Sequence, residues 1–265
     1  MSLLGPYLKS FQLALQTQLT YRVNFAIGRV REFVVYGAIL FLYSALPQGS
    51  GSYSQQELLT YALVSSLLGS AAFVYGMHKI SDEIVEGDLT NYLLRPIHYF
   101  GYWTSRLLAE RALVFVGGIL QTGLLIWLFS SASFFVQKNP IVLLQTAILY
   151  IGSLVLIQLF DFIGGIFSFW TNRGHGARWL ITVFIQFLSG SYLPLDALPG
   201  GIKTILSWTP FPSILFAPLQ IYLGHGSTSL WITHVLTQWL WIGILFLLLR
   251  FLWQRGLKAY SAYGR

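Results

Sequence analysis

Long blocks of apolar residues dominate this chain, and they decide what it can fold into. A helix of about 20 apolar residues crosses the roughly 30 Å hydrocarbon core of a bilayer. Only 9% of the 265 residues are charged and 55% are apolar, whereas soluble domains contain about 25% charged residues. We therefore predict one all-α polytopic membrane domain over residues 1–265. Its six transmembrane helices are predicted at residues 25–46, 58–77, 107–129, 141–162, 179–195 and 230–253.

The basic residues predict how these spans are oriented, because loops rich in Lys and Arg stay in the cytoplasm. With six spans and both termini inside, two basic residues fall on the outer side, Lys138 and Lys203. The other fourteen of the 16 fall on the cytoplasmic side: Lys9, Arg22, Arg29, Arg31, Lys79, Arg95, Arg106, Arg111, Arg173, Arg178, Arg250, Arg255, Lys258 and Arg265. The net charge of +7 is thus an orientation signal. It does not indicate a nucleic-acid site, since the basic residues are scattered.

The segments outside the spans have distinct characters. Residues 1–24 are predicted to form an amphipathic helix in the membrane interface, in contact with lipid, because leucines recur there at helical spacing. Residues 196–229 contain several prolines among apolar runs too short to cross the membrane, which predicts short helices on the outer side before the last span. Residues 78–106 form a cytoplasmic segment, and residues 254–265 a cytoplasmic tail.

The cytoplasmic segment concentrates charge. It carries Asp82, Glu83, Glu86 and Asp88, which are four of the nine carboxylates in the chain. Apolar residues at helical spacing, among them Ile80, Ile84 and Leu89, predict short amphipathic helices that break at Gly87 and end at Pro96. Two interpretations fit this pattern: a solvated charged loop, or a docking element whose charges complement those of a cytoplasmic partner.

Two motifs resemble a known family. Residues 86–96, Glu-Gly-Asp-Leu-Thr-Asn-Tyr-Leu-Leu-Arg-Pro, are similar to the cytoplasmic motif of ABC-2-type exporter permeases, a Glu-Gly-x-Leu core followed by paired leucines and a proline. Asp88 stands where many members carry Thr. Ahead of the last span, the chain resembles the family's Ser-Gly, Pro-Leu and Leu-Pro pattern at Ser189, Gly190, Pro194, Pro199, Pro210 and Pro212. Tyr21-Arg22 and the Leu-Leu-Arg-Pro form resemble the poorly characterised bacterial branch.

The resemblance implies a fold and a function. Family permeases have an amino-terminal interfacial helix, a coupling helix between spans two and three, and re-entrant helices before the last span. They form half of a membrane dimer, with an identical or sister permease, and work with cytoplasmic ABC ATPase subunits that bind ATP and magnesium. A bacterial inner-membrane location is implied. The ATPase-coupling residues would be Ile80, Asp82, Glu83, Ile84, Glu86, Gly87, Asp88, Leu89, Arg95 and Pro96.

The chain is not expected to be an enzyme or to bind a cofactor itself. A phosphate-binding loop needs Gly-x-x-x-x-Gly-Lys-Ser/Thr, and no Gly-Lys pair occurs in the sequence. The five histidines lack the i, i+4 pairing and the neighbouring carboxylates of a metal site. ATP hydrolysis is therefore expected from a partner.

Polar residues within the predicted spans allow alternative roles. Asp161, near the cytoplasmic end of span four, is interpreted as a structural hydrogen-bonding group in preference to a substrate contact. Ser65, Ser66, Gly69 and Ser70 form small-x-x-x-small pairs, which suit helix packing within the protomer and a dimer interface equally. A single-chain secondary transporter would show inverted repeats and more ionisable residues. A membrane enzyme or a scaffold is a further alternative, and an enzyme would need polar residues gathered at one depth.

Overall fold

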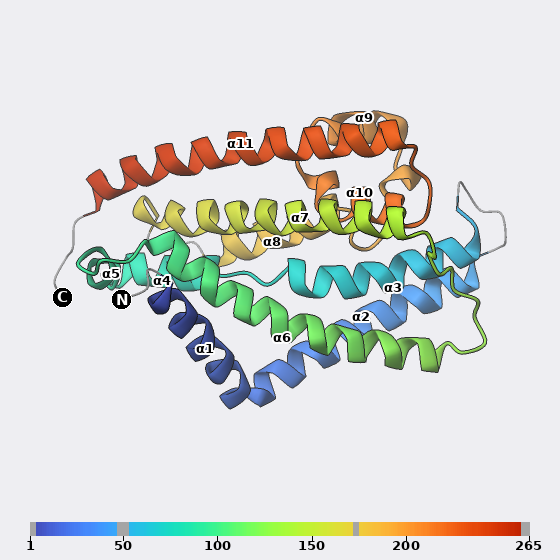
Figure 1. Cartoon of the computed structure of the whole chain (residues 1–265), viewed down its shortest axis with the longest axis horizontal. Coiled ribbons are helices and arrows are strands. Elements are labelled where there is room, and N and C mark those ends of the chain that lie inside the picture. Colours follow the sequence, from blue (N-terminus) through green and yellow to red (C-terminus); the bar gives the residue numbers. More distant parts are fainter. Residues whose placement is uncertain (1–3, 47–52, 172–174, 261–265) are drawn as a thin grey trace.

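The computed structural model describes residues 4–46, 53–171 and 175–260, and throughout these residues the regular structure is helical, with no β-strand (Figure 1). The long helices α3 (Gln55–Ala72), α6 (Tyr99–Leu128), α7 (Pro140–Ile166) and α11 (Thr228–Ala259) run along the long axis of the molecule. The start of α1 (Gly5–Thr20), the end of α11 and the short helices α4 (Met77–Val85) and α5 (Leu89–Leu93) gather at one end. The all-α prediction is confirmed.

Among the described residues, four stretches are long and apolar enough to cross a membrane: Gln55–Val85, Tyr99–Leu128, Pro140–Phe169 and Thr228–Ala259. They match the predicted spans two, three, four and six. The first predicted span lies in α2 (Arg22–Ala45), whose first half carries Arg22, Arg29, Arg31 and Glu32. The fifth lies in α8 (His175–Leu188), which has only 14 residues. The count of six spans therefore stays a prediction.

Some helices begin away from the predicted boundaries. α6 starts at Tyr99, eight residues before residue 107, because the His98 ring accepts the Gly101 N–H (3.3 Å) and caps the helix in the polar segment. The predicted interfacial segment 1–24 divides at Tyr21, where α1 ends and α2 begins. α1 packs along α6 through the face that contains Tyr7 and the buried Ala14, whereas Leu4, Leu8 and Leu19 are exposed.

The predicted outer segment, residues 196–229, consists of short helices. It contains α9 (Gly200–Ser207), α10 (Phe216–Tyr222) and three-residue turns of 3₁₀ helix at Leu195–Ala197 and Phe211–Ser213. α10 packs against α7 and lies at the end of the molecule opposite α4 and α5 (Figure 1). Its placement as a re-entrant helix within a bilayer stays a prediction.

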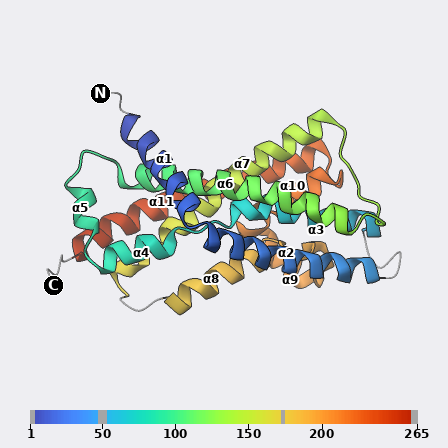
Figure 2. The same ribbon diagram turned by 90° about the horizontal axis from the view of Figure 1, so that it is seen from below.

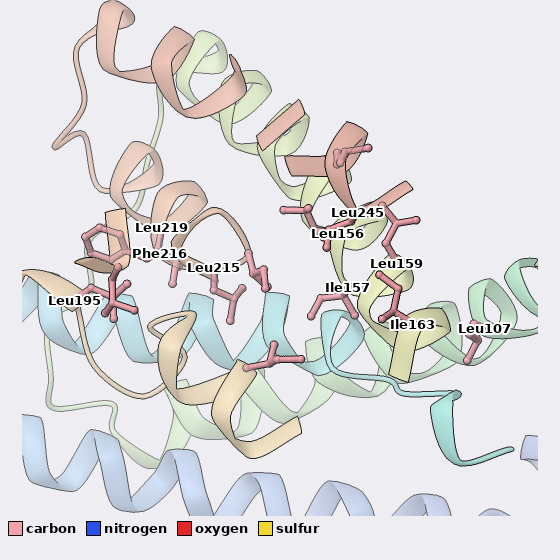
Figure 3. Close-up of a cluster of buried hydrophobic side chains, with 14 of the residues drawn as sticks. Leu107, Leu156, Ile157, Leu159, Ile163, Leu195, Leu215, Phe216, Leu219 and Leu245 are labelled. Carbon is pink, nitrogen blue, oxygen red and sulfur yellow. The ribbon is translucent and has the colours of Figure 1, made fainter. Parts of the chain in front are cut away.

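The helices are held together by a continuous buried cluster. Leucine and isoleucine side chains of α7 meet side chains of α6, α10 and α11 there, including Leu107, Leu219 and Leu245 (Figure 3). Because lipid chains are as apolar as leucine, close van der Waals packing and interhelical hydrogen bonds hold such helices together. Small residues make this packing possible: Gly118 of α6 faces Ser70 of α3, and Gly152 of α7 faces Gln238 of α11.

We predict that Gly152→Ala destabilises the protein. The added methyl group would collide with the Gln238 side chain, whose amide donates to the backbone oxygens of Leu149 (3.0 Å) and Ser213 (2.9 Å). Overpacking of this kind costs about 1–3 kcal/mol. Thermal unfolding in detergent should show a lower midpoint. Gly123→Ala is the matched control, because open space surrounds Gly123 of α6; equal midpoints for both variants would contradict the prediction.

We also predict that the outer segment weakens in acid. Burial favours a raised pKa for Asp196, but hydrogen bonds from Lys203, Tyr53 and Gln220 outweigh it, so the pKa lies below its usual value. A carboxylate whose pKa is depressed in the folded state stabilises the fold above about pH 4. This stabilisation is lost as the pH falls further and the carboxylate is protonated. The unfolding midpoint of Lys203→Met should therefore fall less between pH 6 and pH 3 than that of the unmodified chain. An identical fall would refute this role for Asp196.

Candidate functional site

A buried carboxylate fixes the start of α4. The chain leaves α3 at Ala72, and residues 73–76 lead into α4 outside either helix. The backbone N–H groups of Gly76 and Met77 both donate to the Asp161 carboxylate of α7, at 2.5 and 2.8 Å. Asp161 is fully buried. A negative group at a helix amino terminus is stabilised by the unpaired N–H groups and by the helix dipole, so Asp161 caps α4 from a neighbouring helix.

A pair of glycines on α7 lets α4 lie close. A side chain at Gly165 would come within 2.8 Å of Ile80 Cβ, and one at Gly164 would lie 3.2 Å from the Met77 thioether. Met77, Ile80 and Ile84 are buried, at successive turns on one face of α4. The apolar face of this amphipathic helix is thus seated directly on the α7 backbone.

Glu83 connects α4 to the beginning of α6. Its Oε2 atom accepts hydrogen bonds from Tyr99 Oη (2.8 Å) and Trp103 Nε1 (2.9 Å). The Tyr99 ring in turn stacks on Trp253 of α11, with centroids 5.3 Å apart and planes 13° from parallel. Phe100 meets the same indole at 4.7 Å. α4 is therefore joined to α6 directly and to α11 through one layer of aromatic rings.

Polar contacts add two further attachments. Lys79 forms an ion pair with Glu110 of α6 at 2.7 Å. The hydroxyls of Ser81 and Ser168 lie 2.5 Å apart, and the Arg178 guanidinium of α8 donates to Ser168 at 3.1 Å. These contacts link α4 to α6 and, through the turn of 3₁₀ helix that follows α7 (Phe167–Phe169), to α8.

The chain turns outward after α4. Gly87 adopts a φ of +90°, a left-handed conformation that suits glycine, and the buried Leu89 anchors α5. The residues around this turn remain exposed, and Leu94 reaches 80% exposure. We name them the α4–α5 surface: Val85, Glu86, Asp88, Asn91, Leu93, Leu94, Arg95 and Pro96.

A comparison with protein families identifies the chain. The model for ABC-2 family transporter proteins matches residues 30–264, nearly the whole chain. The chain belongs to the ABC-2 transporter family. No curated protein and no solved structure matches it. ABC-2 proteins are the membrane component of ABC transporters and not the catalytic one, so the chain is a multi-pass permease, in agreement with its apolar helices.

Eight of the ten residues expected to couple this ABC-2 permease to an ATPase divide into an anchoring group and an exposed group. Ile80, Ile84 and Leu89 are buried, and Glu83 is engaged by α6, so these residues hold the segment to the bundle. Asp82 is half-buried and Gly87 makes the turn. Glu86, Asp88, Arg95 and Pro96 belong to the α4–α5 surface.

Sequence reasoning missed the residues on which α4 rests. Gly76 is packed tightly, because a Cβ there would lie 2.9 Å from Leu107 and 3.2 Å from the Asp161 carboxylate. Gly164 and Gly165 were also missed, although a glycine pair three residues after Asp161 is visible in the sequence.

The small residues of α3 make contacts within the protomer. Ser65 donates to the Ser191 oxygen at 2.6 Å, and Ser66 receives the Gln121 amide at 3.2 Å. Gly69 and Ser70 line a cavity between α2, α3 and α8, and Ser70 also faces Gly118 of α6. Within the described residues these contacts fit the packing interpretation. The dimer interpretation is not needed to explain Ser65 and Ser66.

The residues of the second motif shape the chain after α8. Ser189 accepts the Phe216 N–H of α10 (3.0 Å), and Gly190, with a φ of +79°, accepts the Tyr61 hydroxyl (2.5 Å). The prolines punctuate the short helices: Pro194 and Pro199 precede helical turns, Pro210 caps the next one and Pro212 lies within it. The motif thus ties α10 and α3 to the end of α8.

We predict that Asp161→Ala loosens α4. The buried N–H groups of Gly76 and Met77 would lose their acceptor, at a cost of about 1–3 kcal/mol for each unsatisfied group. Hydrogen exchange measured by mass spectrometry should become faster in residues 77–85 than in the protein without the substitution. Asp161→Asn, which retains one carbonyl acceptor, should show a smaller change. Unchanged exchange of α4 in Asp161→Ala would disprove the capping role.

Proposed function

We propose that this chain is the membrane-spanning permease subunit of an ATP-driven ABC exporter, coupled to separate ATPase subunits that bind ATP and magnesium. The translocation path would lie at the interface of two permeases, identical or sister chains. Membership of the ABC-2 family supports the class of protein. The observation that carries the coupling proposal is the attachment of the exposed α4–α5 surface to three long helices.

The α4–α5 surface has the composition of a protein-binding surface. Leu93 and Leu94 supply exposed apolar area, and Glu86, Asp88 and Arg95 surround them with charges of both signs. An apolar centre with a charged rim favours association, because the apolar part gives affinity while the charges set orientation and partner choice. We infer that a cytoplasmic ATPase subunit docks here.

Movement of this surface would be transmitted to the bundle. Asp161 holds α4 to α7, and Glu83 and Lys79 hold it to α6. The stacked Tyr99 and Trp253 rings extend the connection to α11. ATP can shift the permease between two states only if the ATPase binds them with different affinities. Because α4 is joined to α6, α7 and α11, the α4–α5 surface would change position when these helices move. An ATPase bound at this surface would then bind the two states with different affinities.

Exposed apolar faces are available for a second permease. α8 exposes Trp179, Phe184 and Phe187, and α2 exposes Val34 and Phe41. The two helices lie on the same side of the molecule (Figure 2). We infer that the partner permease meets the part of this side around Phe41, whereas lipid covers the part around Trp179, Phe184 and Phe187. The resemblance to bacterial ABC-2 permeases supports an inner-membrane location, and the distribution of basic residues supports placing the α4–α5 surface and both termini in the cytoplasm.

We predict that Glu86→Lys combined with Asp88→Lys uncouples transport. Both side chains are exposed, so the fold should persist while the charge pattern of the docking surface is reversed. Co-purification of a co-expressed ABC ATPase subunit should fall about tenfold or more, with loss of ATP-dependent transport.

Two controls make this test specific. Thr228→Lys adds a lysine at an exposed position at the opposite end of the molecule and should leave assembly unchanged. Glu83→Gln should lower the unfolding midpoint, because Glu83 holds Tyr99 and Trp103. Normal ATPase assembly and transport in the double lysine variant would count decisively against docking at this surface.

A further inference from the structure

A cavity separates α2 from α8. It has a volume of about 330 Å³ and is bounded by α2, α3, α8 and the turn at Ser191 and Tyr192. This volume is near the lower end of the range for small-molecule sites, roughly 300–1,000 Å³. It also exceeds by about tenfold the roughly 30 Å³ that one water molecule occupies in the liquid. The cavity can therefore hold a polar head group, but not a whole lipid.

The wall of the cavity is unusually polar for a chain of this composition. Glu32 and Tyr75 line it, and neither Glu32 Oε2 nor the Tyr75 hydroxyl has a hydrogen-bond partner among the described residues, although both atoms are buried. Gln186 and Ser70 contribute further polar groups. Buried polar groups normally find partners, so this wall retains unused capacity to accept and donate hydrogen bonds.

The charge of the cavity favours an anion at its mouth. Arg29 already pairs with Glu32 at 2.9 Å, which neutralises the carboxylate. Arg31 lines the cavity, is exposed, and adds a further positive charge beside that pair. A guanidinium binds phosphate through parallel N–H···O hydrogen bonds, which makes it well suited to a phosphate group.

The mouth opens where the surface is apolar. Val35, Val183 and Trp179 line the cavity and are exposed, and Trp179 reaches 61% exposure. The neighbouring Val34, Phe184 and Phe187 are exposed as well. A ligand that fills the cavity therefore has apolar protein surface beside it, against which an alkyl chain can lie.

We propose that this cavity binds the head group of a phospholipid that carries hydroxyl groups, of the phosphatidylglycerol type. The phosphate contacts Arg31, the hydroxyls reach toward Glu32 and Tyr75, and the acyl chain lies on the apolar surface of α2 and α8. One part of this inference rests on the proposed function: if the chain is a permease, this site is an entrance to the transport path. Binding itself requires no ATPase.

The test measures lipid binding to the full chain purified in detergent and freed of lipid. Native mass spectrometry compares lysophosphatidylglycerol with lysophosphatidylcholine. Both head groups contain a phosphate, but glycerol carries hydroxyl groups, whereas choline lacks a hydrogen-bond donor and adds a positive charge. We expect the glycerol form to bind at least tenfold more tightly. Tyr75→Phe should reduce this preference, and Arg31→Gln should weaken binding of both lipids.

A steric pair of variants locates the site. Val183→Trp should obstruct the mouth and weaken lysophosphatidylglycerol binding tenfold or more. Ile181→Trp places the same side chain at another exposed position of α8 that does not line the cavity, and should bind within twofold of the unmodified chain. Circular dichroism and the unfolding midpoint establish that both variants are folded.

The possible results separate the two proposals. Equal binding of both lipids would exclude recognition of the head-group hydroxyls, and Val183→Trp binding like Ile181→Trp would exclude binding in this cavity; either result would overturn this inference. Selective binding by a chain that shows no ATP-dependent transport would refute the proposed function and leave the lipid site standing. Transport without selective binding would refute the lipid site alone.

Discussion

The Asp161 carboxylate is the interaction on which the arrangement of the α4 end depends. A helix that begins at membrane depth or at its boundary exposes several N–H groups with no internal partner. Asp161 satisfies two of them, at Gly76 and Met77, from inside the bundle. The carboxylate gains partners that offset its burial, and α4 gains a fixed starting point. The carboxylate is tolerated in a buried position because it accepts two hydrogen bonds, and the two N–H groups are tolerated there because the carboxylate is their acceptor.

A fixed starting point turns α4 into a rigid attachment. The helix is seated on Gly164 and Gly165, so it cannot approach α7 any more closely. Its far end is held by Glu83 and by the aromatic layer at Trp253. By contrast, α8 leaves much of its apolar surface exposed and borders a cavity. Rigid contacts therefore surround α4, while free volume is concentrated beside α8.

Hydropathy predicted the long helices because a span is a local property of about 20 successive residues. Four predicted spans match helices of sufficient length and apolarity. The pattern of α4 placed Ile80 and Ile84 on a buried face for the same local reason. The role of Glu83 could not be predicted this way, since it depends on Tyr99 and Trp103, 16 and 20 residues later. Which carboxylates of this segment anchor it and which stay exposed depends on tertiary contacts, and a local sequence pattern does not contain them.

The same reasoning connects the α4 end to the cavity. Tyr75 lines the cavity wall, and the next residue, Gly76, donates its N–H to Asp161. Tyr75 lies in the short stretch of residues 73–76 between α3 and α4, whose backbone dihedrals change when α4 is displaced relative to α3. Such a displacement can therefore move the Tyr75 side chain and alter that wall. A ligand held by Tyr75 and an ATPase bound at the α4–α5 surface would then influence each other's affinity equally, because coupling between two binding sites is reciprocal.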